Sequence, residues 1–145
     1  MLSLTYSVGL RVSEIINLKI EDIDSDRMVI HIKNAKGGKD RIVPLSQTIL
    51  SLLRDYYKLH KPKEYLFNGQ TSGTYSATSC NKLVKKYLGN KYHMHQLRHS
   101  CFTHLLESGV DLRVIQSIAG HNSTKTTEIY THVSKKLLNK VVLPI

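Results

Sequence analysis

Two histidines and an arginine are spaced to share one face of a predicted helix. His95, Arg98 and His99 lie three and four residues apart in the stretch "HMHQLRHSCFTHLL", and side chains at these spacings point to the same side of an α-helix. They can therefore converge on a metal ion or on an anion. A helical zinc protease site has a Glu directly after its first His, whereas Gln96 follows His95 here. The fixed charge of Arg98 also opposes a bound cation, so the pattern favours an anion and we expect no metal and no other cofactor.

The charge of the whole chain also favours an anionic partner. The 145 residues include 21 Lys and Arg against 11 Asp and Glu, which gives a formal net charge of +10 and a pI near 9.7. Such a surplus is typical of a surface that binds phosphates. No apolar run approaches the roughly 20 residues that a membrane span requires, and no secretory signal opens the chain. With only Cys80 and Cys101, both in predicted helices, we expect a soluble, reduced, cytoplasmic protein with free thiols.

Four further side chains extend the site, and together the segments resemble a known family. Arg11 lies in "GLRVSE", Lys36 in "AKGGK", His121 in "AGHNS" and Tyr130 in "TTEIYTHV". The segment "TYSVGLRVSEIINL" resembles the one that carries the first arginine of the tyrosine recombinases, also called phage integrases. "KGGKDRIVPL" resembles their β-hairpin lysine segment, "HQLRHSCFTHLL" their His-x-x-Arg box, and "IQSIAGHNSTKTTEIYTHV" their final box. Four boxes in the family order make the resemblance specific.

The resemblance implies a catalytic site of six residues: Arg11, Lys36, His95, Arg98, His121 and Tyr130. Tyr130 would attack a phosphodiester of double-stranded DNA and form a 3′-phosphotyrosine intermediate. A phenol has an unperturbed pKa of about 10, so a base must take its proton, and His95 is the candidate. Arg11 and Arg98 would hold the non-bridging oxygens of the phosphate. Cutting and rejoining would then need neither metal nor ATP.

The other polar residues of these boxes receive supporting roles. Lys36 would protonate the departing 5′-oxygen, with Lys39 as its nearest rival, and His121 would donate a hydrogen bond to the phosphate. Lys39 and Arg41 are predicted to contact DNA phosphates. Glu14, three residues after Arg11, either orients that arginine or forms a surface ion pair with it. We expect His99 and His104 to face the core or to cap neighbouring groups, and Cys101 to lie in the core.

The implied function is that of the catalytic domain of a site-specific recombinase or integrase. Two alternatives are a type IB topoisomerase, which uses similar chemistry to relax DNA, and a non-enzymatic DNA-binding derivative, although all six positions are filled. Arg11 follows only ten residues of chain, so we expect a single catalytic domain over residues 1–145, without the upstream core-binding domain of the family. The apolar "VVLPI" end suggests that residues 134–145 form a tail that docks on a neighbouring protomer.

The elements that must position these side chains can also be predicted. Alternating, β-branched "RMVIHIKN" and "DRIVPL" predict a β-hairpin with the glycines at its tip. Helical periodicity, caps and glycine stops predict two short helices around a turn at Ser7–Gly9, then helices after Ser46, at about 77–88, 93–107 and 112–119, and from near Ser123. The expected fold is α+β, mostly helical with a small antiparallel β-sheet.

Overall fold

The structure is a computed structural model, and it describes residues 1–33, 40–69, 73–120 and 143–145. The helices are α1 (Leu2–Val8), α2 (Val12–Asn17), the 3₁₀ helix η1 (Ile20–Asp22), α3 (Gln47–His60), α4 (Ala77–Leu88), α5 (Met94–Glu107) and α6 (Leu112–Ala119). The strands are β1 (Ile23–Asp24), β2 (Val29–Ile32) and β3 (Arg41–Pro44). The mostly helical α+β class predicted from the sequence is confirmed.

Most helices begin and end where the local signals predict, although α1 continues to Val8, through most of the turn predicted at Ser7–Gly9. The side chains of Ser46 and Asp111 each accept a hydrogen bond from a backbone N–H in the first turn of α3 and α6. Gly9 and Gly120 end α1 and α6 in the left-handed conformation, with φ of 66° and 63°, which glycine adopts without steric cost. The predicted helix that starts near Ser123 lies outside the described residues.

The strands form one antiparallel sheet in the order β1-β2-β3. β2 and β3 pair with Ile30 opposite Val43 and Ile32 opposite Arg41, which confirms the predicted hairpin. Its tip, with Lys36 and Lys39, lies outside the described residues. Ile30 and Ile32 are buried, so one face of the sheet covers the core.

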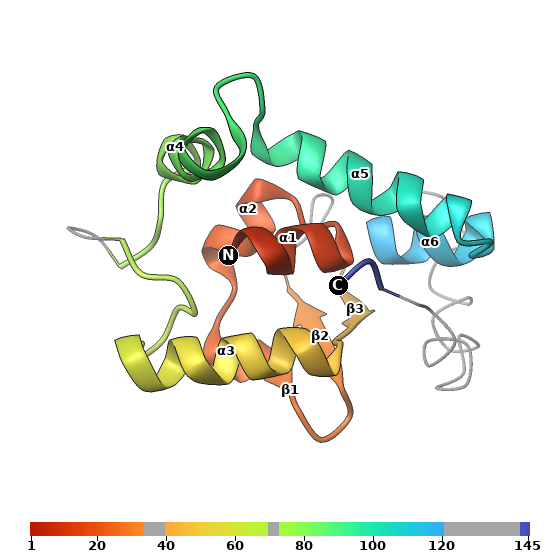
Figure 1. Cartoon of the computed structure of the whole chain (residues 1–145). Coiled ribbons are helices and arrows are strands. Elements are labelled where there is room, and N and C mark those ends of the chain that lie inside the picture. The colour runs from red at the N-terminus through yellow and green to blue at the C-terminus, as the bar shows by residue number, and fades with distance from the viewer. Residues whose placement is uncertain (34–39, 70–72, 121–142) are drawn as a thin grey trace.

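The core surrounds the first two helices. In Figure 1, α1 and α2 lie between α3 on one side and α4 and α5 on the other, and α1 packs along α5. Leu4 and Val8 of α1 and Ile15 of α2 are buried in the main apolar cluster. Both cysteines are free and buried, which confirms the predicted free thiols and the predicted core position of Cys101. None of the helices in the described part of the chain is long and apolar enough to cross a membrane.

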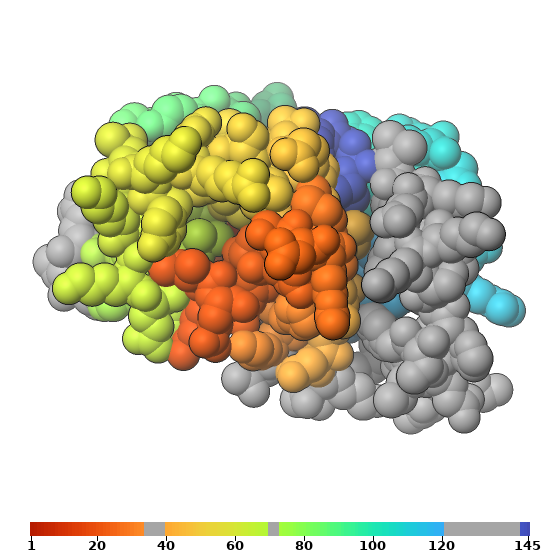
Figure 2. Space-filling model, turned by 90° about the horizontal axis from the view of Figure 1, so that it is seen from below, coloured from red at the N-terminus to blue at the C-terminus, as the bar shows by residue number. Residues whose placement is uncertain are grey.

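The last three residues return to the body of the protein. Leu143 packs against the main apolar cluster, and Ser46 Oγ donates a hydrogen bond to the carbonyl of Ile145 at 3.1 Å. Figure 2 shows these residues in blue beside the start of α3. Residues 134–142 of the predicted tail lie outside the described residues, while its end contacts the core of its own chain.

Candidate active site

Three arginines from different elements meet at the end of α6. Each donates a hydrogen bond to one of three consecutive backbone carbonyls: Arg41 Nε to Ile118 at 2.7 Å, Arg98 Nη2 to Ala119 at 2.7 Å, and Arg11 Nη2 to Gly120 at 3.3 Å. Carbonyls at a helix C-terminus lack partners within the helix and carry the negative end of its dipole. Cationic donors satisfy both requirements, and they hold the backbone immediately before His121 in place.

Glu14 supplies the counter-charge for this cluster. Its Oε1 lies 3.0 Å from Arg11 Nη1 and 2.5 Å from Arg41 Nη1, and its Oε2 accepts from the Arg11 backbone N–H and from Arg41 Nη2, each at 2.8 Å. Burial by itself would raise the pKa of Glu14, but the hydrogen bonds and charge of Arg41, and then the bonds from Arg11, outweigh it and lower the pKa to about 2. Glu14 does contact Arg11 as predicted, within a buried network instead of a surface ion pair.

The structure corrects the prediction that Arg41 contacts DNA phosphates. Arg41 is only 4% exposed, and its guanidinium is held by Glu14 and by the carbonyl of Ile118. On β3, Arg41 and Val43 alternate toward the interior while Ile42 is exposed. The side chain is therefore a buried cation paired with a carboxylate, which is the arrangement that a buried charge requires.

Arg11 and Arg98 differ in how exposed they are to solvent. Arg98 is 5% exposed and also donates to the carbonyl of Gly9, with its guanidinium over the Phe102 ring. Burial, and then the charge of Arg11, lower the pKa of Arg98 to about 10, so it stays charged at neutral pH. The Arg11 side chain is 23% exposed. Arg11 is thus the more accessible cation of the pair.

His95 and His99 form a ring pair on the exposed face of α5. Their ring centroids lie 4.5 Å apart with the planes at 85°. Although the residue is exposed, desolvation of its ring, and then the charges of His99, Arg98 and His93, lower the pKa of His95. A neutral imidazole at neutral pH can accept a proton. His99 does not face the core, which was one of the two placements predicted for it, because its exposed side chain lies against the His95 ring.

His104 lies further along α5 and is also exposed. Its Nδ1 is hydrogen-bonded to the Tyr6 hydroxyl of α1. His104 therefore contacts a neighbouring group, which is one of the two placements predicted for it, and it does not face the core.

A groove runs beside these histidines between α5 and α6. It has a volume of about 340 Å³, and its lining includes His95, Arg98, His99 and Gln116. His95 and Arg98 thus share one surface, and Arg98 and Arg11 bind adjacent carbonyls of the α6 end. The described structure brings together three of the six predicted catalytic residues: Arg11, His95 and Arg98. The other three, Lys36, His121 and Tyr130, lie outside the described residues, as does Lys39.

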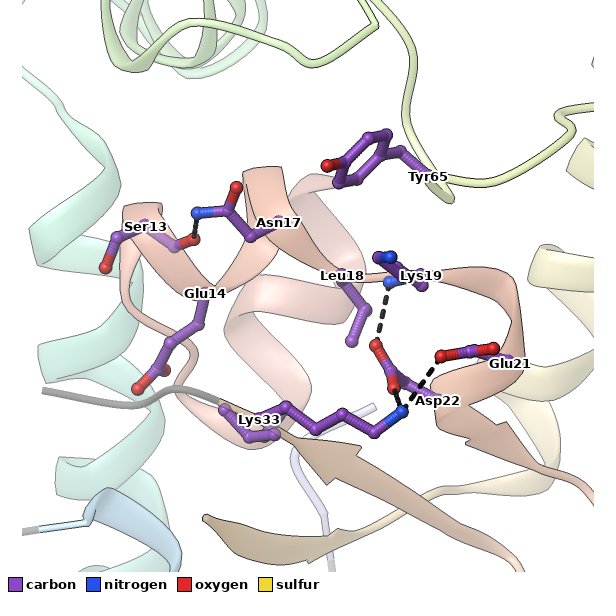
Figure 3. A pocket seen from close by; sticks show the side chains of 10 residues that line it. Ser13, Glu14, Asn17, Leu18, Lys19, Glu21, Asp22, Lys33 and Tyr65 are labelled. Carbon is purple, nitrogen blue, oxygen red and sulfur yellow. Dashed lines mark hydrogen bonds and ion pairs between the residues drawn. The ribbon is translucent and has the colours of Figure 1, made fainter. Parts of the chain in front are cut away.

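A second pocket of about 520 Å³ borders Glu14 and is lined by α2, η1 and the end of β2. Figure 3 shows the Lys33 ammonium between the carboxylates of Glu21 and Asp22, with Glu14 on the opposite side of the pocket. Lys33 Nζ lies 3.0 Å from Glu21 Oε1 and 2.7 Å from Asp22 Oδ1. Two carboxylates thus neutralise this lysine, and Glu64 pairs with Lys19, the other lysine of the lining, at 2.7 Å. Within the described residues no group of three His, Cys, Asp or Glu side chains could hold a metal ion.

The structure adds a basic surface that the sequence reasoning missed. Lys82, Lys85 and Lys86 on α4 and Lys91 just after it are exposed, and the Lys86 ammonium lies 5.2 Å from the centroid of the Tyr87 ring. We call these four lysines the α4 lysine surface. The lysines are visible in the segment "NKLVKKYLGNK". Only the fold shows that α4 packs against α2, which directly follows Arg11, and against α5, which carries His95 and Arg98.

Comparison with known proteins identifies the family. The model of the phage integrase family matches residues 1–136. The chain belongs to the phage integrase family. It is 43% identical to the tyrosine recombinase XerA of Pyrococcus horikoshii over 98% of its own length and 52% of the relative. The family resemblance predicted from the sequence is therefore confirmed.

Solved structures of family members have the same fold as this chain. A crystal structure of XerA recombinase matches with a TM-score of 0.75 at 33% identity, covering 94% of the chain and 53% of that structure. The XerH site-specific recombinase bound to its difH substrate matches with a TM-score of 0.72 at 29% identity, covering 97% of the chain and 44% of that structure. The chain thus spans about half the length of these relatives.

Proposed function

We propose that residues 1–145 form the catalytic domain of a site-specific recombinase, which cuts and rejoins double-stranded DNA through a 3′-phosphotyrosine. The observation that carries the proposal is the convergence of Arg11 and Arg98 on adjacent carbonyls of the α6 end, directly before His121. Family membership supports the assignment. The DNA complex of XerH supports double-stranded DNA as the substrate.

The proposed reaction assigns one step to each residue. Tyr130 forms a bond to phosphorus as the bond to the 5′-oxygen breaks, while His95 accepts the phenolic proton and Lys36 gives a proton to the 5′-oxygen. Arg11 and Arg98, with a hydrogen bond from His121, stabilise the charge on the non-bridging oxygens. The phosphotyrosine keeps a phosphoester bond, so a free 5′-hydroxyl can reverse the step without ATP. No metal ion has a role in these steps.

The experiment that tests this function traps the covalent intermediate. We would incubate the chain with nicked duplexes whose cleaved end diffuses away, in EDTA, and locate any DNA adduct by mass spectrometry. Tyr130→Phe should abolish the adduct, whereas the matched variant Tyr57→Phe, an exposed tyrosine on α3, should retain it. An adduct elsewhere, one that requires a divalent ion, or none at saturating DNA would contradict the proposal. Relaxation of plasmids without recombinant products would instead indicate a topoisomerase.

We further propose that the tail at residues 134–145 joins recombinase protomers on DNA, and that the protein works in the cytoplasm. The apolar end of the sequence supports the assembly role. Because Leu143 packs on its own core and Ile145 is bonded to Ser46, docking on a neighbour would require this end to leave its own chain. Deleting Val141–Ile145 should weaken assembly on DNA in sedimentation experiments while single-strand cleavage persists. Loss of cleavage in the deletion would show that the tail acts within one chain.

A further inference from the structure

We propose that Arg41 is a positioning residue for strand transfer. By holding Glu14 and the last turn of α6 at the same time, it sets Arg11 relative to the end of α6, which directly precedes His121 in the sequence. The inference rests on the proposed function, in which Arg11 and His121 both act on the scissile phosphate. Arg41 itself is buried and would touch neither the DNA nor the reacting atoms.

The guanidinium of Arg41 is used on two sides. Its Nη1 and Nη2 donate to the two oxygens of Glu14 at 2.5 and 2.8 Å, while Nε donates to the carbonyl of Ile118 at 2.7 Å. A planar fork of fixed donors can hold a carboxylate with two bonds and a carbonyl with a third. A lysine in the same place has one charged nitrogen and lacks this fork. The geometry is therefore specific to arginine.

The contact with Glu14 extends the influence of Arg41 to Arg11. The same carboxylate binds the side chain and the backbone N–H of Arg11. Without Arg41, the full negative charge of Glu14 would face Arg11 alone. Arg11 would then be drawn toward Glu14 and away from the carbonyl of Gly120, and its charge would be less available to a phosphate oxygen.

The contact with α6 extends the influence of Arg41 to the His121 segment. The Arg41 side chain packs directly under Gly120, where an added Cβ would lie 3.0 Å from Arg41 Cδ. Gly120 is the residue before His121 and has a φ of 63°. Arg41 thus supports the turn at Gly120, directly before His121 in the sequence. It does so although it lies 77 residues before Ile118.

Arg41→Lys tests the proposal because it keeps the charge but removes the fork. The matched control is Arg54→Lys, an exposed arginine on α3 outside the proposed machinery. Single-turnover cleavage of the nicked duplex at saturating protein should fall by about 100-fold, the scale expected for a catalytic group displaced by about 1 Å. The half-saturating concentration should stay unchanged. Arg41→Gln provides a second variant, and both are assayed where circular dichroism shows the chain folded.

Two modified substrates separate positioning from a general structural role. A methylphosphonate at the scissile position removes one charged oxygen, so the cleavage rate depends less on the position of Arg11. The difference in rate between Arg41→Lys and the parent chain should therefore become smaller. A sulfur in place of the 5′-oxygen leaves as a thiolate, so this substrate needs no proton from Lys36. The difference in rate between Arg41→Lys and the parent chain should then stay the same. If the sulfur substrate restored the rate, Arg41 would act through the hairpin lysine and the proposal would be wrong.

Two further outcomes would also overturn the inference. They are equal rates for Arg41→Lys and the parent chain, and a loss of rate that only follows the loss of folded protein. If the parent chain formed no adduct on Tyr130, the proposed function itself would fail, and this result is distinguishable because it needs no variant.

Discussion

Glu14 is a buried carboxylate that forms ion pairs with two arginines. It contacts both Arg11 and Arg41, and the α6 carbonyls bind these two arginines as well as Arg98. Removing one partner of a buried charge network is costly because the remaining charge stays in a poorly solvated site. Stability should therefore depend on the ionisation of Glu14.

We predict that Glu14→Gln lowers the free energy of unfolding by about 3 kcal/mol at pH 7. The pKa of Glu14 in the folded chain, about 2, lies below its ordinary value of 4.5. The stabilisation is therefore complete above the ordinary pKa and is lost as the pH falls from there toward 2. Urea unfolding of the parent chain and the variant at pH 7 and pH 3 measures this. The difference should be smaller at pH 3, and an equal difference at both pH values would contradict the assignment; Glu107→Gln, at an exposed position on α5, is the control.

His99 should affect the pH below which the cleavage rate falls. Its charge contributes to the lowered pKa of His95, and a base works only while it is neutral. In His99→Phe, which keeps the ring contact but not the charge, the pKa of His95 should rise. The acid limb of the cleavage rate should then move to higher pH, while His60→Phe on α3 should leave it in place. An unchanged limb, or a shift to lower pH, would show that His99 does not tune the base or that His95 is not the base.

The junction between α1 and α5 depends on a glycine with a particular conformation and no side chain. Gly9 ends α1 with φ of 66°, and a Cβ there would lie 2.5 Å from the Phe102 ring on α5. The carbonyl of Gly9 also accepts from Arg98. A side chain at this position would disturb the helix end, the helix contact and the arginine together.

Gly9→Ala should therefore lower the free energy of unfolding by more than the backbone strain alone would. Gly109→Ala is the matched control, since Gly109 has φ of 79° with nothing within 4 Å of an added Cβ. Strain at each site is worth about 1 kcal/mol, and overpacking at Gly9 adds about 1 to 3 kcal/mol. Denaturant midpoints compare the two variants. Equal losses would mean that the Phe102 ring moves aside freely.

The whole molecule combines a small sheet with helices that surround α1 and α2 (Figure 1), and it carries a net charge of +10. The α4 lysine surface lies on a helix that packs against both α2 and α5. If DNA runs over this side of the protein, the lysines should displace counterions from the phosphates.

Replacing Lys82, Lys85 and Lys86 with Gln should therefore weaken DNA binding and reduce its salt dependence. The slope of log K against log salt should fall by roughly 0.9 for each phosphate that the protein no longer neutralises. The control replaces Lys58, Lys61 and Lys63, which are exposed at and just after the end of α3. Titrations at several salt concentrations decide the matter. An equal decrease of slope in both triple variants would mean that only the net charge counts.

Local signals in the sequence were sufficient for most elements. Capping residues, glycine stops and strand alternation depend on neighbours in the chain, and for this reason α4 and the hairpin appear where they were predicted. The strand β1 was missed because its two residues are too few to show an alternation. The order and spacing of the four boxes likewise identified the family without any knowledge of contacts.

The partners of the charged side chains were decided only by the tertiary structure. The position of Arg41 near Lys36 and Lys39 in the sequence predicts a place with Lys39 on the DNA surface, although its alternation with Val43 on β3 indicates an inward position. Its actual partners are Glu14 and Ile118, which lie 27 and 77 residues away. A buried charge needs hydrogen-bonding or oppositely charged partners, and those of Arg41 are too distant in the sequence for a local pattern to contain them. The sequence therefore determined the family and the elements, while packing determined which arginine remains accessible and which is held inside.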